Sequence, residues 1–261
     1  MKDSWRVYVQ AYSASLQAKL EYRADFVVGV VTSMMMQAAG LSLLWTVLRA
    51  SPTLGGWTPP QILFLFGMTA ACAGGSELFF NQIWVLPQAI VMGDLDRLLT
   101  YPVRALPFYL VTRPELHAFG NLLTGLMYLT TSLWWMHAAF YVWLAAPLFW
   151  LCGMLTYTSV LVWFGSLSFR FIGPQMSSMM VAHNLLQATR YPLGTYPRFM
   201  RVVLLIVLPF GTFHFLPGSV FFGKGAPLIA LGCAPVAAVV TMLLAQKAWN
   251  LGLRHYDSTG S

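Results

Sequence analysis

The chain has 261 residues, of which 58% are hydrophobic and only 9% are charged, with a formal net charge of +7. Soluble domains carry roughly 25% charged residues, so this composition excludes an ordinary soluble domain and indicates an integral membrane protein. The apolar runs are continuous and about 20 residues long, as membrane-spanning helices require, whereas outer-membrane strands alternate apolar and polar residues. We therefore expect an all-α helical bundle that forms a single membrane domain over residues 1–261.

Residues 1–25 predict an amphipathic helix that lies in the membrane interface. Polar residues stand between large apolar residues, which recur at helical spacing at Trp5, Tyr8, Tyr12, Leu16 and Leu20. A cleaved secretory signal is disfavoured, because the segment before the first long apolar run is too long and shows no small-residue cleavage site.

Six membrane spans are expected after this helix. The fifth contains Pro209, Gly211, Pro217 and Gly218, which interrupt a straight helix and favour a broken span with a re-entrant segment at its outer end. The expected spans are Phe26–Leu48, Pro60–Gln82, Glu115–Met136, Ala139–Phe169, Met200–Phe222 and Ala226–Trp249.

The distribution of Lys and Arg predicts the orientation in the membrane. On this assignment, the N-terminal segment, the connection 83–114, the loop after the fourth span with Arg170, Arg190, Arg198 and Arg201, and the C-terminal end carry all the Lys and Arg residues except Arg49 and Lys224. Because positive residues collect on the cytoplasmic side, both termini and these two long connections are expected there.

Motifs for catalysis and for metal binding do not occur in the sequence. There is no phosphate-binding loop, no HExxH and no GxSxG, and the five histidines show no ligand spacing. Cys72, Cys152 and Cys233 lie inside apolar runs and are interpreted as small hydrophobic residues. We expect no catalytic residue, metal or cofactor in this chain. No long basic run or basic–aromatic platform indicates nucleic-acid binding.

A few polar residues are expected within the spans. Glu77 lies near the cytoplasmic end of the second span, Gln37 near the middle of the first and Asn121 in the third. An ionisable group in a membrane is a functional candidate, so these three residues are candidates for a substrate path. Structural roles remain open, with Glu77 reaching headgroup water and the amides forming interhelical hydrogen bonds.

Three stretches carry a resemblance to a known family. They are GDLDRLLTYPVRALPFYLVTR at 93–113, YPLGTYPRFMRVVLLIVLPFGTFHFLPGSVFFG at 191–223 and AWNLGLRHYDSTGS at 248–261. Together with six spans and the N-terminal helix, they resemble the membrane-spanning permease subunit of a type-2 ABC exporter. The most similar subgroup is bacterial and is often found with a second permease and a separate ATPase.

The resemblance implies two permeases and two ABC ATPase subunits in the cytoplasmic membrane of a bacterium. ATP and Mg would be bound by the ATPase subunit, and the second permease would be a different chain or a second copy. Importer permeases carry a Glu-Ala-Ala loop, which is absent here, so export is favoured. The abundant Met and aromatic residues suit hydrophobic or amphipathic cargo, including cationic, drug-like compounds.

The resemblance also suggests roles for two segments. A helix after the second span would dock on the ATPase, with Ile90, Val91, Leu95, Leu98 and Leu99 as an apolar anchor. The alternative is that this segment is a solvent-exposed loop, kept polar by the topology, with no docking role. An outer gate is expected at Pro209, Phe210, Phe213, His214 and Pro217. The residues expected to couple the chain to the ATPase are Gly93, Asp94, Leu95, Asp96, Arg97 and Leu98.

Other classes of function make different demands on the sequence. A secondary transporter would need an ion gradient and inverted repeats, which are not visible. A membrane-embedded enzyme acting on lipid would need converging polar groups at one depth, and a scaffold would not respond to ATP hydrolysis.

Overall fold

The computed structural model describes residues 2–50, 53–170 and 175–256. Within these ranges the chain is helical, and the one extended pairing is an isolated bridge between Leu54 and Trp57. This confirms the predicted all-α class. The helices are α1 Lys2–Leu20, α2 Arg23–Ala50, α3 Pro59–Phe80, α4 Leu86–Val91, α5 Asp94–Leu99, α6 Ala105–Val111, α7 Ala118–Trp135, α8 Phe140–Ser166, α9 Gln175–Ala188, α10 Arg198–Val202, α11 Phe215–Phe221 and α12 Cys233–Leu253.

Four segments in the described ranges are long and apolar enough to cross a membrane. They contain α2, α3, α8 and α12, and a fifth is obtained if the bent pair around α10 and α11 counts as one span. Helix α7, of 18 residues, falls within the expected third span but is not among these segments. The chain is therefore a multi-pass membrane protein, while the count of six spans stays a prediction.

Helix α3 is the central helix, and 78% of its most apolar stretch is buried. It packs closely against α7, because small residues let the two backbones approach each other. A Cβ atom added at Gly74 would overlap the backbone of Leu122, and one at Gly125 would overlap the backbone of Ala71. Larger side chains at these glycines would force the two helices apart.

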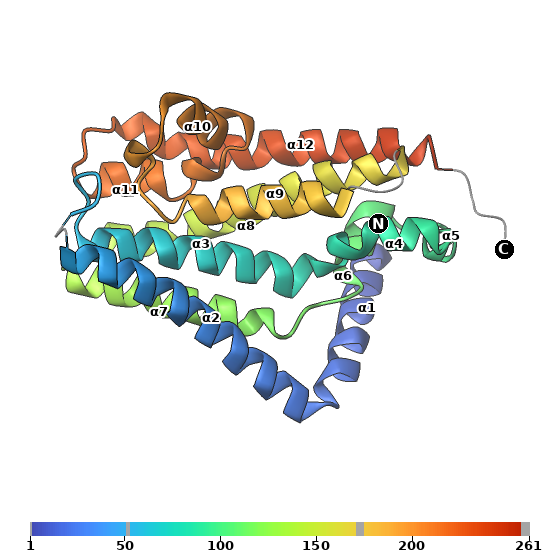
Figure 1. Ribbon diagram of the computed structural model, residues 1–261. Helices are drawn as coiled ribbons and strands as arrows, with labels where there is room; N and C mark the ends of the chain where they lie inside the picture. Colours follow the sequence, from blue (N-terminus) through green and yellow to red (C-terminus); the bar gives the residue numbers. More distant parts are fainter. Residues whose placement is uncertain (1, 51–52, 171–174, 257–261) are drawn as a thin grey trace.

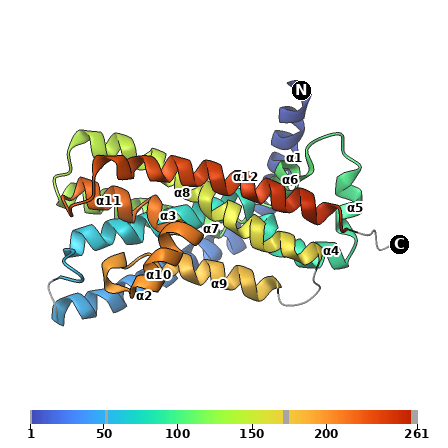
Figure 2. The ribbon, with the colours of Figure 1, turned by 90° about the horizontal axis from the view of Figure 1, so that it is seen from above.

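Helix α9 runs along the bundle with one side against α8 (Figures 1 and 2), while Met180, Val181 and Asn184 on its other side are exposed. His183 Nδ1 lies 2.6 Å from the hydroxyl of Tyr157 on α8, and Thr195 beyond the helix touches Gly55, just before α3. The expected connection 170–199 thus contains a helix over Gln175–Ala188 that runs along the bundle, and its place relative to the membrane stays a prediction. Residues 171–174 of that segment lie outside the described residues. Among the polar residues of α9, His183 has its partner on another helix, and Gln187 bonds His183 within the same helix.

The chain bends by 82° between Arg198–Val207 and Phe210–Phe221. The break falls at Leu208–Pro209, where Pro209 has no N–H to continue the helix. Both parts lie at the end of the bundle near α11 and far from α5 (Figure 1). A broken segment was expected here. Helix α9 and the turn after it run to this same end of the bundle. The bent pair therefore begins at this end.

The two ends of the bundle are called here the α5 end and the α11 end. Helix α1 runs across the bundle at the α5 end, where α12 also finishes (Figures 1 and 2). Arg198 and Arg201 on α10 lie at the α11 end, and Arg190 lies inside the bundle. Their assignment to the same face as α5 is therefore wrong. Most of the other Lys and Arg residues still lie toward the α5 end.

Candidate functional site

The segment between α3 and α6 forms a projecting turn at the α5 end. Helices α4 and α5 are separated by Met92 and Gly93, and Gly93 has φ +74°, a left-handed conformation that a glycine adopts without steric cost. The expected coupling segment therefore consists of two short helices that meet at Gly93, where a kink was expected. We call residues 91–101 the α5 tip.

The α5 tip has an inner and an outer side. Leu95 is fully buried and Ile90 nearly so, whereas Val91 and Met92 are 58% and 72% exposed. The predicted apolar anchor is thus divided, with two members holding the tip to the bundle and Val91 and Leu99 facing outward. Among the predicted coupling residues, Asp94 and Arg97 are exposed, Asp96, Leu98 and Gly93 are half-buried, and Leu95 is buried. The exposed residues Met92 and Tyr101 were not predicted to contribute.

Buried aromatic rings connect the region around the α5 tip to the ends of the long helices. Tyr109 on α6 packs on Trp249 of α12 with ring centroids 5.6 Å apart, and Trp249 meets Phe169 edge to face at 5.2 Å. Phe169 follows α8, and its ring lies where a Cβ atom on Gly252 would be. A displacement of α6 would therefore press directly on α12 and on the end of α8.

Charges of the α5 tip reach the same cluster. Burial, together with the Asp96 carboxylate, raises the pKa of the Tyr256 hydroxyl to about 12. Burial also raises the pKa of Tyr109, and Asp94 adds to this while Gln82 and Arg113 oppose it. Tyr256 packs on Phe169 with ring centroids 6.1 Å apart. The tip is therefore linked to the chain beyond α12 by charge and by aromatic packing.

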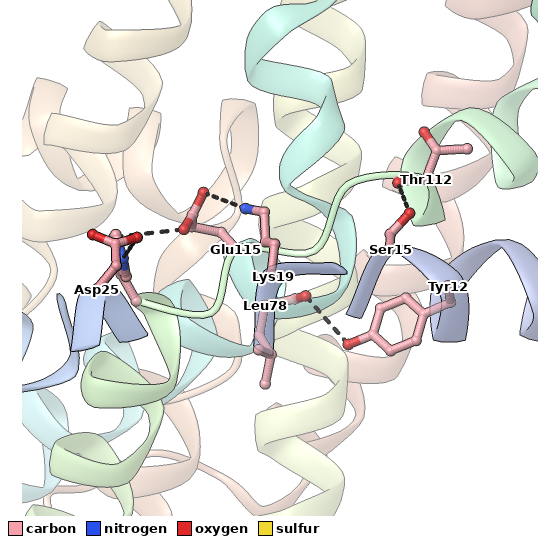
Figure 3. Close-up of polar contacts among 8 residues, drawn as sticks. Tyr12, Ser15, Lys19, Asp25, Leu78, Thr112 and Glu115 are labelled. Atoms are coloured by element: carbon pink, nitrogen blue, oxygen red, sulfur yellow. Dashed lines mark hydrogen bonds and ion pairs between the residues drawn. The ribbon is translucent and has the colours of Figure 1, made fainter. Parts of the chain in front are cut away.

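Helix α1 is fixed to the α5 end by polar contacts, drawn in Figure 3. Ser15 donates to the carbonyl of Thr112 at 2.6 Å, the Tyr12 hydroxyl lies 3.5 Å from the carbonyl of Leu78, and Lys19 pairs with Glu115 at 3.1 Å. His117 lies between the Glu115 and Asp25 carboxylates. These contacts tie α1 to the α6–α7 connection, so the helix can follow movements of that region.

The three predicted path residues form one hydrogen-bonded chain. Asn121 donates to the Glu77 carboxylate at 3.2 Å, and Gln37 donates to Asn121 at 2.9 Å. Arg190 donates to the Gln37 amide oxygen at 2.8 Å. We call these four residues the polar chain. It begins at the Arg190 guanidinium, which can only donate, so the orientation of each amide along the chain is fixed.

Arg190 was not expected in this chain, because the sequence suggested a topology-determining charge. Its guanidinium also lies over the Phe66 ring, 5.2 Å from the centroid, and against Gly40 of α2. The polar chain therefore joins α3, α7 and α2 to the turn after α9. Asn121 donates to Glu77 across α7 and α3, so Glu77 is satisfied within the protein.

The five predicted gate residues are brought together at the α11 end and are all buried. His214 is held at 2.8 Å from the carbonyl of Thr189, the Phe210 ring packs on Tyr157, and Phe213 occupies the space beside Gly153. Through these contacts the bent segment packs against α8 and against the turn after α9. Their role as a gate stays a prediction.

An apolar pocket of about 310 Å³ opens between α8, α12 and the bent segment. Trp163, Val207 and Leu244 contribute to its walls, and Pro209 is the one predicted gate residue that lines it. The size is in the range of small-molecule pockets. The site thus combines an exposed tip at one end with an apolar pocket toward the other.

A family model described as "ABC-2 family transporter protein" matches residues 34–260, nearly the whole chain. No curated protein and no solved structure matches the chain. The matched region includes five of the predicted functional features, namely Gln37, Glu77, the α5 tip, Asn121 and the bent segment. The chain therefore belongs to the ABC-2 transporter family and is a membrane permease of an ABC transporter, which implies an ABC ATPase as its partner.

Proposed function

We propose that the chain is the permease subunit of an ATP-driven exporter that moves hydrophobic or amphipathic compounds out across a bacterial cytoplasmic membrane. A separate ATPase subunit, which binds ATP and Mg, would dock on the α5 tip. Closure of the ATPase subunits would then move the spans between inward-open and outward-open arrangements. On this proposal, the α5 end and both termini face the cytoplasm.

The observation that carries this proposal is the two-sided α5 tip. Its outer side combines the exposed apolar residues Val91 and Met92 with the exposed charges of Asp94 and Arg97. Apolar area of this kind supplies affinity in a protein interface, while the charges fix the orientation of the partner. Its inner side is anchored by Leu95 and leads to the Tyr109–Trp249 contact. A segment anchored in this way can transmit a displacement of its outer side to α6 and α12.

The burial of α2 supports a second permease in the complex. Only 11% of its most apolar stretch is buried, against 78% in α3. Met35, Met36 and Leu43 are each at least 67% exposed. We assign this face to a second permease, identical or different, with the cargo path between the two copies.

The nature of the cargo is inferred from the same surfaces. The pocket beside Pro209 is almost entirely apolar, and α2 offers flexible Met side chains that adapt to varied shapes. Hydrophobic and amphipathic compounds, including cationic drug-like ones, fit these surfaces.

The experiment is transport by the purified complex. The chain is isolated with the ATPase that co-purifies with it and reconstituted into liposomes, and neutral, cationic and anionic fluorescent amphiphiles are tested in turn. The proposal predicts ATP-dependent accumulation of at least one amphiphile on the side away from the α5 tip. It also predicts that the transported compound raises the rate of ATP hydrolysis.

Three results would contradict the proposal. Movement driven by an ion gradient without ATP would indicate a secondary transporter. Chemical conversion of added lipid would indicate a membrane-embedded enzyme. ATP-dependent movement toward the α5 side would show that the direction is import.

A further inference from the structure

A second pocket lies at the α5 end, between the start of α6 and the last turns of α12, and its volume is about 410 Å³. One part of its wall is apolar and includes Leu106, Trp249 and Leu253. The other part is polar and consists of Arg104, Gln246 and Asn250. No acidic residue of the described chain lines it.

The polar wall is suited to an anionic oxygen. Gln246 donates to the Asn250 amide oxygen at 2.9 Å, a bond that leaves both N–H groups of Asn250 to face other acceptors. Arg104 is exposed and supplies a guanidinium, whose fork matches phosphate geometry. The indole N–H of Trp249 is buried without an acceptor among the described residues.

The pocket lies at the level expected for lipid headgroups. Helix α1, which runs across the bundle at this end, packs on α6 through Tyr8 and Phe108, with ring centroids 6.1 Å apart. A helix of this kind marks the membrane interface. Along α12 only 28% of the most apolar stretch is buried, so an apolar surface for acyl chains continues from the pocket.

We propose that this pocket binds the headgroup of an anionic phospholipid. The phosphate would interact with Arg104 and the Asn250 amide, and the acyl chains would lie along α12. Basic pockets beside membrane spans bind anionic headgroups in this manner. The bound lipid would link α6 to α12 beside the Tyr109–Trp249 contact, so it would strengthen the connection between the α5 tip and the long helices.

The test uses the whole complex in nanodiscs of phosphatidylcholine alone or mixed with increasing amounts of phosphatidylglycerol. The complexes are then transferred from the nanodiscs into neutral detergent. Native mass spectrometry counts the phosphatidylglycerol molecules that each permease retains. The Arg104→Gln complex is expected to need about tenfold more phosphatidylglycerol for the same occupancy, because it lacks a charge-assisted hydrogen bond. Asn250→Asp, which places a negative charge in the pocket, is expected to lose retention as well.

Arg113→Gln is the matched control. It removes the same charge from the same connection at an exposed residue that does not line the pocket, so it is expected to retain lipid like the unchanged complex. All variants are compared for ATPase content and melting temperature in phosphatidylcholine alone, which identifies a folding defect. The proposal is wrong if properly folded Arg104→Gln retains lipid normally, if Arg113→Gln loses it equally, or if inorganic phosphate displaces the lipid as a free anion would.

Discussion

Arg190 donates a hydrogen bond of 2.8 Å to the amide oxygen of Gln37, joining the turn after α9 to the middle of α2. The bond completes the polar chain, in which donors run in one direction from Arg190 to the Glu77 carboxylate. Only 11% of the most apolar stretch of α2 is buried, and the polar chain adds to the packing of α2 against α7. A transport cycle that moves α2 must therefore break or shift it.

Removing Gln37 tests this attachment. Gln37→Leu leaves Asn121 and Arg190 without their partner, and we expect a loss of about 1–2 kcal/mol in the stability of the complex. Thermal unfolding of the purified complex measures it. Ser42→Ala, on the same helix, is the control, because the Ser42 hydroxyl is exposed and bonds only its own helix at Ala39. Equal melting temperatures for the two variants would contradict the proposed attachment.

The polar chain should behave as one unit. Glu77→Gln and Arg190→Gln each remove one charged end, so the double variant should be less destabilised than the sum of the single ones. We expect a difference from additivity of about 0.5–3 kcal/mol in unfolding free energy, as in other connected networks. Purely additive effects would show that the two ends do not communicate through Gln37 and Asn121.

Charge reversal tests the outer side of the α5 tip. Asp94 and Arg97 are exposed, so Asp94→Lys combined with Arg97→Glu should leave the fold of the permease intact. We expect at least a tenfold weaker association with the ATPase, since misplaced interface charges cost about 1.4 kcal/mol or more. Quantitative pull-down of the ATPase measures this, and Arg49→Glu, near the α11 end of α2, serves as the control. Undiminished association would contradict docking at the tip.

Trp249 tests transmission through the aromatic cluster. Trp249→Leu removes the contacts with Tyr109 and Phe169, whereas Trp249→Phe keeps an aromatic ring there. We expect Trp249→Leu to hydrolyse ATP with the docked ATPase but to move much less cargo per ATP. The Phe variant should recover most of the loss. Parallel loss of hydrolysis and transport in a stable Leu variant would show that Trp249 does not transmit the motion.

Close packing of α3 on α7 makes a separate prediction about stability. Gly125→Ala places a methyl group against the backbone of Ala71, so we expect a loss of about 1–3 kcal/mol. Gly232→Ala adds the same group where nothing lies within 4 Å and should be nearly neutral. Thermal unfolding compares the two, and equal stability would contradict the observed approach of the helices.

The apolar runs were sufficient to predict the helical class and the positions of α2, α3, α8 and α12, because crossing lipid requires long apolar helices. A helix over 175–190 was expected, but its course along the bundle could not be recognised in this way. Its polar residues find partners such as Tyr157 in another helix, and hydropathy does not record such pairing. Polar residues one helical turn apart, such as His183 and Gln187, were the available signal that this segment has a buried side.

The candidate site was predictable to a similar extent. Glu77, Gln37 and Asn121 stood out because polar groups in a membrane are costly, and they do meet in the structure. Arg190 was missed because its role depends on where α9 ends. The links of Tyr109 to Trp249 and of Asp96 to Tyr256 join segments far apart in the chain, so the sequence held no local signal for them.

Photo-crosslinking to the ATPase from the α5 tip tests whether the tip is the docking site. A benzophenone amino acid is placed at Met92, which is 72% exposed at the tip, or at Ile229, which is 82% exposed in the segment before α12 at the α11 end. If the ATPase docks on the α5 tip, crosslinks to the ATPase form from position 92 and none form from position 229. Crosslinks from position 229 with none from position 92 would contradict it.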